Sequence, residues 1–162
     1  MSAWDTPTVS AVRLYLVQHG LAKSADDDPL RPLTDEGADD VSRVARLATS
    51  RLDVKAERIV HSGKTRARET AEIWAALLGI DAEEDDGLAP NDDPARWVER
   101  LSGETTDVML VGHLPHLAAL AGALLTGNPS RQVIDFQQGG LITLERAETG
   151  WSVVVVLPPS VA

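Results

Sequence analysis

The chain has 162 residues, no cysteine and a formal net charge of −10 at pH 7. This length suits one domain with its own hydrophobic core, and the lack of cysteine excludes disulfides, thiolate catalysis and cysteine-bound metals. The acidic balance argues against a nucleic acid or a membrane surface as partner, because either would call for a basic face. Since the first residues do not read as a signal peptide and no apolar run could span a bilayer, we expect a cytoplasmic protein.

Strand and helix patterns alternate along the chain. We predict a loose tail over residues 1–10, a single domain over 11–157 and a short exit tail over 158–162. The predicted strands cover residues 12–17, 58–60, 107–111, 141–144 and 151–157. The predicted helices cover residues 37–50, 64–78, 94–101 and 115–125.

This alternation indicates an α/β fold, a three-layer sandwich with helices on both faces of a mostly parallel central sheet. Thr34 is a suitable N-cap for the first helix, and Gly79 is a suitable stop for the second. The last two strands are separated by a tight polar turn, which predicts a C-terminal antiparallel hairpin. The acidic stretch 81–93 is predicted to be a loop with room for a short strand.

Three predicted strands end in residues that can carry chemistry. The first ends at His19-Gly20, the second at Ser62, and the third at His113. In open α/β sheets, ligands bind beyond the carboxyl ends of the strands. Taken singly, each of these side chains also fits a purely structural role in a turn or a helix cap.

The surroundings of these strand ends favour an anion such as a phosphate. His113 precedes a predicted helix, whose free N–H groups and positive dipole end attract anions. Arg66 lies one turn into the helix after Ser62, where its guanidinium can reach back over the strand end. The four histidines of the chain do not have the spacing of a zinc motif, so no metal is expected.

The order of these motifs resembles the histidine phosphatase superfamily, and within it the short phosphohistidine phosphatases of the SixA type. The resemblance extends over about residues 12–157. Three further stretches support it, at residues 31–37, 62–71 and 111–116. It implies that His19 is the nucleophile that becomes phosphorylated, that Arg66 clamps the phosphate, and that His113 stabilises the transferring phosphoryl group. It implies no cofactor.

The chain departs from the family pattern at Gln18, where the family has arginine. Glutamine supplies neither the charge nor the fork of a guanidinium. The loss of one charge-assisted hydrogen bond costs about tenfold to a hundredfold in rate. Lys23 and Arg31 are both candidates to return the charge. We therefore expect a substrate-binding set made of Gln18, Gly20, Lys23, Arg31 and Ser62.

No single acidic residue stands out as a general acid. The stretch 85–93 is rich in carboxylates, but a solvated acidic loop is the favoured interpretation of them. A P–N bond needs less acid assistance than a P–O bond once its nitrogen is protonated. The expected substrate is therefore phosphohistidine on a protein, with a small phosphate ester as the alternative. A catalytically impaired module that binds phosphate or phosphoproteins is the rival from another class, and Gln18 is the feature that favours it.

Overall fold

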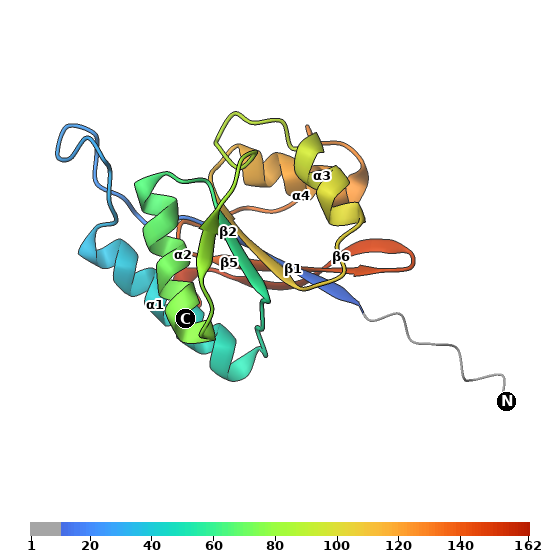
Figure 1. The fold of residues 1–162 in the computed structure, drawn as a ribbon, viewed down its shortest axis with the longest axis horizontal. Coiled ribbons are helices and arrows are strands. Elements are labelled where there is room, and N and C mark those ends of the chain that lie inside the picture. Colours follow the sequence, from blue (N-terminus) through green and yellow to red (C-terminus); the bar gives the residue numbers. More distant parts are fainter. Residues whose placement is uncertain (1–10) are drawn as a thin grey trace, which may run out of the picture.

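The computed structural model describes residues 11–162, which form one six-stranded sheet with helices on both faces (Figure 1). The strands are β1 (Val12–Gln18), β2 (Arg58–His61), β3 (Ala82–Glu84), β4 (Val108–Gly112), β5 (Leu141–Ala147) and β6 (Gly150–Leu157). The helices are α1 (Asp35–Arg51), α2 (Thr65–Leu78), α3 (Ala95–Ser102) and α4 (His116–Thr126), and a 3-10 helix follows at Pro159–Val161. No helix in this described part is long and apolar enough to cross a membrane.

The strand order is β3-β2-β4-β1-β5-β6. The first four strands of this order are parallel to one another, whereas β5 is antiparallel to β1 and β6 is antiparallel to β5. The predicted α/β sandwich with a mostly parallel sheet and a terminal hairpin is therefore confirmed. Its parallel half brings the carboxyl ends of β1, β2 and β4 to the same edge of the sheet.

Strand β1 lies in the interior of the sheet and is covered on both faces. Tyr15 and Val17 pack with α1 and α2, while Leu14 and Leu16 pack on the opposite face with α3 and α4. Successive side chains of a strand point to opposite faces, so a strand buried on both sides needs an unbroken apolar run. This explains why the stretch that leads to His19 shows no polar alternation.

Two helix boundaries follow from local signals. Thr34 caps α1, because its Oγ1 accepts a hydrogen bond of 2.9 Å from the Gly37 amide. Gly79 ends α2 at a φ of 69°, in the left-handed region that glycine adopts without a steric penalty. Both boundaries were predicted, and both are confirmed.

Two details differ from the sequence prediction, and a third agrees with it. Strand β5 continues to Ala147, because the hairpin turn takes only the two residues before Gly150. The acidic stretch contains the short strand β3, for which the prediction left room, and this strand pairs with β2. The segment expected to be an exit tail contains the 3-10 helix, and Arg43 Nη1 donates to the Pro159 carbonyl at 3.0 Å. The tail predicted over residues 1–10 lies outside the described residues.

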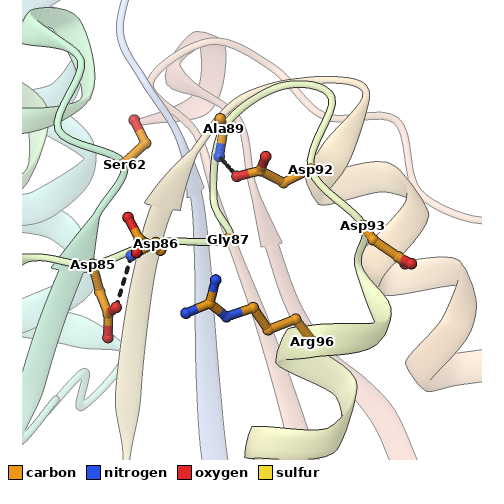
Figure 2. Close-up of a pocket in the computed structure, with 8 residues that line it drawn as sticks. All are labelled: Ser62, Asp85, Asp86, Gly87, Ala89, Asp92, Asp93 and Arg96. Carbon is orange, nitrogen blue, oxygen red and sulfur yellow. Dashed lines mark hydrogen bonds between the residues drawn. The ribbon is translucent and has the colours of Figure 1, made fainter.

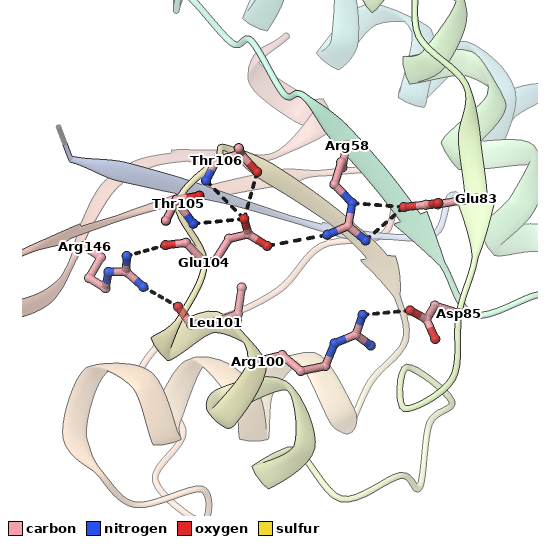
Figure 3. Close-up of polar contacts among 9 residues, drawn as sticks. All are labelled: Arg58, Glu83, Asp85, Arg100, Leu101, Glu104, Thr105, Thr106 and Arg146. Atoms are coloured by element: carbon pink, nitrogen blue, oxygen red, sulfur yellow. Dashed lines mark hydrogen bonds and ion pairs between the residues drawn. The ribbon is translucent and has the colours of Figure 1, made fainter.

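Ion pairs fasten the loops around β3 and α3 to the sheet (Figure 3). Arg58 on β2 pairs with Glu83 at 2.9 Å and with Glu104 at 3.5 Å. Asp85, which follows β3, pairs with Arg100 on α3 at 2.8 Å. Such surface pairs contribute little stability each. They connect β2 to β3 and to the segment after α3, and they connect the start of the acidic loop to α3.

We expect truncation of Trp74 to destabilise the helix that carries Arg66. The Trp74 side chain is fully buried on α2, whereas Leu77 on the same helix is 42% exposed. Trp74→Ala should lower the free energy of unfolding by about 3–5 kcal/mol, because it leaves a cavity in the core. Leu77→Ala should cost less than about 1 kcal/mol in the same urea titration, and equal losses would contradict the packing described here.

Candidate active site

The sheet brings three predicted site residues to adjacent strand ends. His19 follows β1, Ser62 follows β2, and His113 follows β4. Strand β4 lies between β2 and β1, and Gln18 pairs with Gly112 across the β1–β4 ladder. His113 therefore lies between Ser62 and His19.

The ring of His19 is held in one orientation. Its Nδ1 is 2.7 Å from the carbonyl oxygen of Gly20. A carbonyl can only accept a hydrogen bond, so Nδ1 carries the proton and a neutral ring keeps its lone pair on Nε2. Burial is the main cause that lowers the pKa of His19, and the charges of Arg66 and Arg31 lower it further. The Gly20 hydrogen bond acts in the other direction, but the net effect favours a neutral ring.

Gly20 allows the chain to pass close to the start of α1. A Cβ atom at this position would lie 2.9 Å from the Gly37 carbonyl oxygen and 2.9 Å from a methyl group of Val41. The Gly20 amide donates to Thr70 Oγ1 at 3.0 Å, and that hydroxyl donates in turn to the Arg66 carbonyl at 2.8 Å. Thr70 thus connects the His19 loop to the helix that carries Arg66. It is part of the second motif, but sequence reasoning did not assign it a role.

His113 is 1% exposed, and its ring lies beside that of His19 with 5.0 Å between centroids. Its Nε2 is 2.6 Å from Ser62 Oγ. Burial, followed by the charges of His19 and Arg66, lowers the pKa of His113 to about 3. The ring is therefore neutral at physiological pH.

Arg66 is the principal cation of the site. It forms no ion pair with a carboxylate of the described residues, and its buried Nε hydrogen-bonds to none of them. Burial and the nearby charge of Arg31 both lower its pKa. Buried or partly buried charges are usually paired in proteins. Two like charges held together without a carboxylate are typical of an anion-binding site.

Of the two cations proposed to replace the family arginine, Arg31 lies near the site. Its charge lowers the pKa of both His19 and Arg66, and its Nε donates to the Lys23 carbonyl at 3.1 Å. Arg31 has a φ of 49°, which residues other than glycine adopt infrequently. Lys23 is exposed, and it is not among the charges that act on His19, Arg66 or His113.

Gln18 is 7% exposed, and its Oε1 accepts no hydrogen bond from another described residue. The residue lines a cavity of about 450 Å³ that α1 and the segment after β6 help to form, with Glu36 and Asp40 among its walls. An uncharged, buried amide thus stands at the end of β1.

A second cavity, of about 440 Å³, begins at Ser62 (Figure 2). The loop between β3 and α3 forms most of its wall, and Arg96 projects into it from α3. The lining residues are Ser62, Asp85, Asp86, Gly87, Ala89, Asp92, Asp93 and Arg96. This cavity adjoins the histidine pair, because Ser62 is also the partner of His113.

The other two histidines lie around this centre. His61 ends β2, and its Nδ1 accepts a hydrogen bond of 3.1 Å from the Gly63 amide. His116 begins α4 and is buried. Within residues 11–162, no group of three or more His, Cys, Asp or Glu side chains is arranged to hold a metal ion.

Comparisons with known proteins agree with this geometry. The family model of the histidine phosphatase superfamily, branch 1, matches residues 14–90, which contain His19 and Arg66. The structure of a protein histidine phosphatase SixA complexed with tungstate matches with a TM-score of 0.79 at 24% identity, over 92% of this chain and 98% of that chain. No curated protein sequence matches the chain significantly.

Two further solved structures have the same fold. One, provisionally named a phosphohistidine phosphatase SixA from Agrobacterium tumefaciens, matches with a TM-score of 0.73 at 26% identity, over 91% of this chain and 98% of that one. The other is the alpha-ribazole phosphatase from Shigella flexneri, with a TM-score of 0.73 at 17% identity, over 91% of this chain and 97% of that one. The chain thus resembles the histidine phosphatase superfamily, branch 1, in sequence over residues 14–90. Its fold is similar to that of the SixA phosphatases.

The buried state of His113 predicts a pH-dependent stability. The pKa of His113 in the folded chain, about 3, lies below the ordinary value of 6.5. Between these two pH values, His113 is therefore protonated in the unfolded chain but not in the folded chain. The free energy of unfolding should therefore fall as pH drops from about 6.5 toward 3, and remain unaffected by this group above that window. His113→Gln should remove a slope of at most about 1.4 kcal/mol per pH unit.

Urea titrations of the wild type and of His113→Gln at several pH values between 4 and 7 would measure this difference. Equal m-values would show that the two proteins unfold between comparable states. Parallel stability curves for the two proteins would contradict a neutral, buried His113.

Proposed function

We propose that the chain is a phosphatase that works through a covalent phosphohistidine at His19 and removes phosphate from phosphohistidine on proteins. The observation that carries the proposal is the state of His19, a buried neutral ring whose Nδ1 is committed to the Gly20 carbonyl. Its Nε2 lone pair is thereby available to attack phosphorus. The charges of two guanidinium groups, Arg66 and Arg31, act on this ring, and neither group forms an ion pair with a carboxylate of the described residues.

The reaction has two displacements. In the first, His19 Nε2 forms a bond to phosphorus while the bond between phosphorus and the leaving nitrogen breaks. The electron pair of the broken bond stays on the leaving nitrogen. In the second, a water oxygen attacks the phosphorus of phosphorylated His19, the P–N bond to His19 breaks, and inorganic phosphate leaves. Both hydrogens of the water leave with the phosphate as dihydrogen phosphate, which then equilibrates with the solvent, and His19 returns to its neutral form with Nδ1 protonated.

The surrounding residues mainly counter negative charge. Phosphoryl transfer depends on alignment and on compensation of the charge on the phosphoryl oxygens. Arg66 and Arg31 supply positive charge, whereas His113, adjacent to His19, is neutral and adds none. Thr70 acts as a positioning residue, because its hydroxyl connects the loop of His19 to the helix of Arg66.

The substrate class follows from the leaving group. A phosphohistidine imidazole that is protonated on its second nitrogen leaves as a neutral ring, so no strong general acid is required. The SixA structure that shares this fold was solved with tungstate, a tetrahedral oxyanion, which supports an oxyanion site in this architecture. The alpha-ribazole phosphatase keeps a small phosphate ester as the second candidate substrate.

A module that only binds phosphoproteins is the rival function. The uncharged Gln18 favours it, because one charge of the family pattern is missing. The orientation of His19 counts against it, since a binding module does not require a nitrogen lone pair held toward the bound phosphate.

Trapping of the intermediate would test the proposal. The wild type, incubated with a phosphohistidine protein and quenched in alkaline denaturant, should carry a phosphate on His19 that is lost in acid. His19→Ala should show no label and a loss of about 10⁴-fold or more in kcat, because the nucleophile is gone. His116→Gln, a buried histidine outside the pair, should still label. Absence of label and of turnover on both phosphoamides and phosphoesters would refute the enzyme and favour the binding module.

The two candidate compensating cations make a second test. Arg31→Ala should lower kcat/KM by about tenfold to a hundredfold, because a charge near the phosphoryl oxygens is lost. Lys23→Ala should leave kcat/KM within about twofold of the wild type, since an exposed lysine outside the site changes only the distant field. The reverse order of these two effects would show that the charge is returned by Lys23.

A further inference from the structure

The cavity that begins at Ser62 has a charge opposite to that of the phosphate end of the site. We propose that this cavity receives the part of the substrate beyond the scissile bond and selects substrates that carry positive charge there. This inference rests on the proposed function and names its substrate class, a phosphorylated segment with lysine or arginine next to the phosphorylated residue.

The position of Ser62 connects the cavity to the reacting centre. Its Oγ lies 2.6 Å from Nε2 of His113. The centroid of the His113 ring lies 5.0 Å from the centroid of the His19 ring. Ser62 is at the same time a wall of the cavity (Figure 2). A phosphoryl group at His19 would thus be near the entrance, and 440 Å³ offers room for one side chain and its neighbours.

Carboxylates outnumber cations in this cavity. Asp85 is already paired with Arg100 at 2.8 Å (Figure 3). Asp86, Asp92 and Asp93 remain, and Arg96 is the one cation among the lining residues. Arg96 forms no ion pair of its own among the described residues, so the cavity retains an excess of negative charge.

The acidic wall is also held in place. Asp92 accepts a hydrogen bond of 2.9 Å from the Ala89 amide, and Asp93 accepts one of 2.9 Å from the Ala95 amide. Trp97 Nε1 donates to the Asp86 carbonyl at 3.2 Å. Carboxylates fixed in this way do not have to be ordered when a ligand binds, so more of their attraction is available for recognition.

A buried histidine lies near this acidic wall without forming part of it. The ring of His116 is 1% exposed, and neither of its nitrogens hydrogen-bonds to another described residue. The charges of Asp92 and Asp93 act on this ring and raise its pKa against the larger lowering by burial. The residues that line the cavity do not include His116, so the acceptors open to a ligand are the carboxylates of the wall, and ammonium and guanidinium groups are the donors that complement them.

The two ends of the site thus favour opposite charges on the substrate. Arg66 and Arg31 favour the phosphoryl anion, while the acidic cavity repels anions that follow it. Small phosphoesters with a carboxylate close to the phosphate should be poor substrates for this reason. A basic segment around the phosphorylated residue satisfies both ends, and it is also attracted by the net charge of −10.

A binding experiment tests the inference without depending on turnover. Three peptides of equal length carry a non-hydrolysable phosphohistidine analogue flanked by lysine, glutamine or glutamate, and fluorescence anisotropy measures their dissociation constants. We expect the lysine peptide to bind about tenfold more tightly than the glutamate peptide at low salt, with the glutamine peptide between them. The preference should shrink at 0.5 M NaCl, where the Debye length is only about 4 Å.

A double variant identifies the residues responsible. In Asp86→Asn/Asp93→Asn both substitutions are isosteric, and asparagine at residue 93 can still accept from the Ala95 amide. This variant should lose most of the preference for lysine. The control is Asp39→Asn/Asp81→Asn, which makes the same charge change at two exposed positions outside the cavity and should keep the preference.

The outcomes separate this inference from the proposed function. Equal affinity of the wild type for the three peptides would overturn the inference, and so would an equal loss of preference in the two double variants, because the discrimination would then come from the net charge alone. Phosphorylation of His19 is measured in a separate assay. A protein that labels but shows no charge preference refutes only the inference, while one that discriminates without labelling refutes only the catalytic proposal.

Discussion

The close contact between Gly20 and the start of α1 determines where His19 lies. The chain leaves β1 at Gln18 and passes so near the Gly37 carbonyl that a single added methyl group would collide with it. This proximity leaves the Gly20 amide directed at Thr70 and its carbonyl at the His19 ring. One backbone path thus fixes the tautomer of the candidate nucleophile and its distance from the arginine helix.

Burial and charge in the site depend on each other. Burial keeps the rings of His19 and His113 neutral, and neutral rings allow two arginines to stand nearby without repulsion from a third and fourth cation. The protein as a whole is acidic, so an anionic phosphate is repelled at long range. In the proposed function, affinity for the phosphoryl group therefore comes from short-range contacts, where the low local dielectric makes Arg66 and Arg31 effective.

Much of the fold could be predicted from the sequence, since its signals are local. The N-cap at Thr34, the stop at Gly79 and the apolar run of β1 each depend on a few neighbouring residues. The same is true of the candidate pair His19 and His113, because a histidine directly after a buried strand is visible in the sequence. The true length of β5 escaped prediction, because it depends on how few residues the hairpin turn requires.

The parts that could not be predicted depend on contacts between distant residues. Ser62 and His113 are separated by 51 positions, and nothing in either neighbourhood specifies the bond between their side chains. From the sequence alone, Arg31 and Lys23 were equally good candidates to return the missing charge. The structure distinguishes them by the left-handed backbone of Arg31 and by its hydrogen bond to the Lys23 carbonyl. The acidic stretch looked like a solvated loop, because only the fold shows that it lines a cavity next to Ser62.

The uncharged side chain of Gln18 can be related to its surroundings and to the position of Arg31. Its amide is buried at the end of β1, and carboxylates of α1 line the same cavity, so an arginine there would have two anions within its surroundings. In the proposed site the positive charge comes instead from Arg31, on a loop that Glu69 holds by accepting a 2.7 Å hydrogen bond from the Leu33 amide. A charge on a loop is held less rigidly than one on a strand, so it stabilises a transition state less well. Such a site is suited to a bond that breaks easily, which is the property that distinguishes phosphohistidine from a phosphate ester.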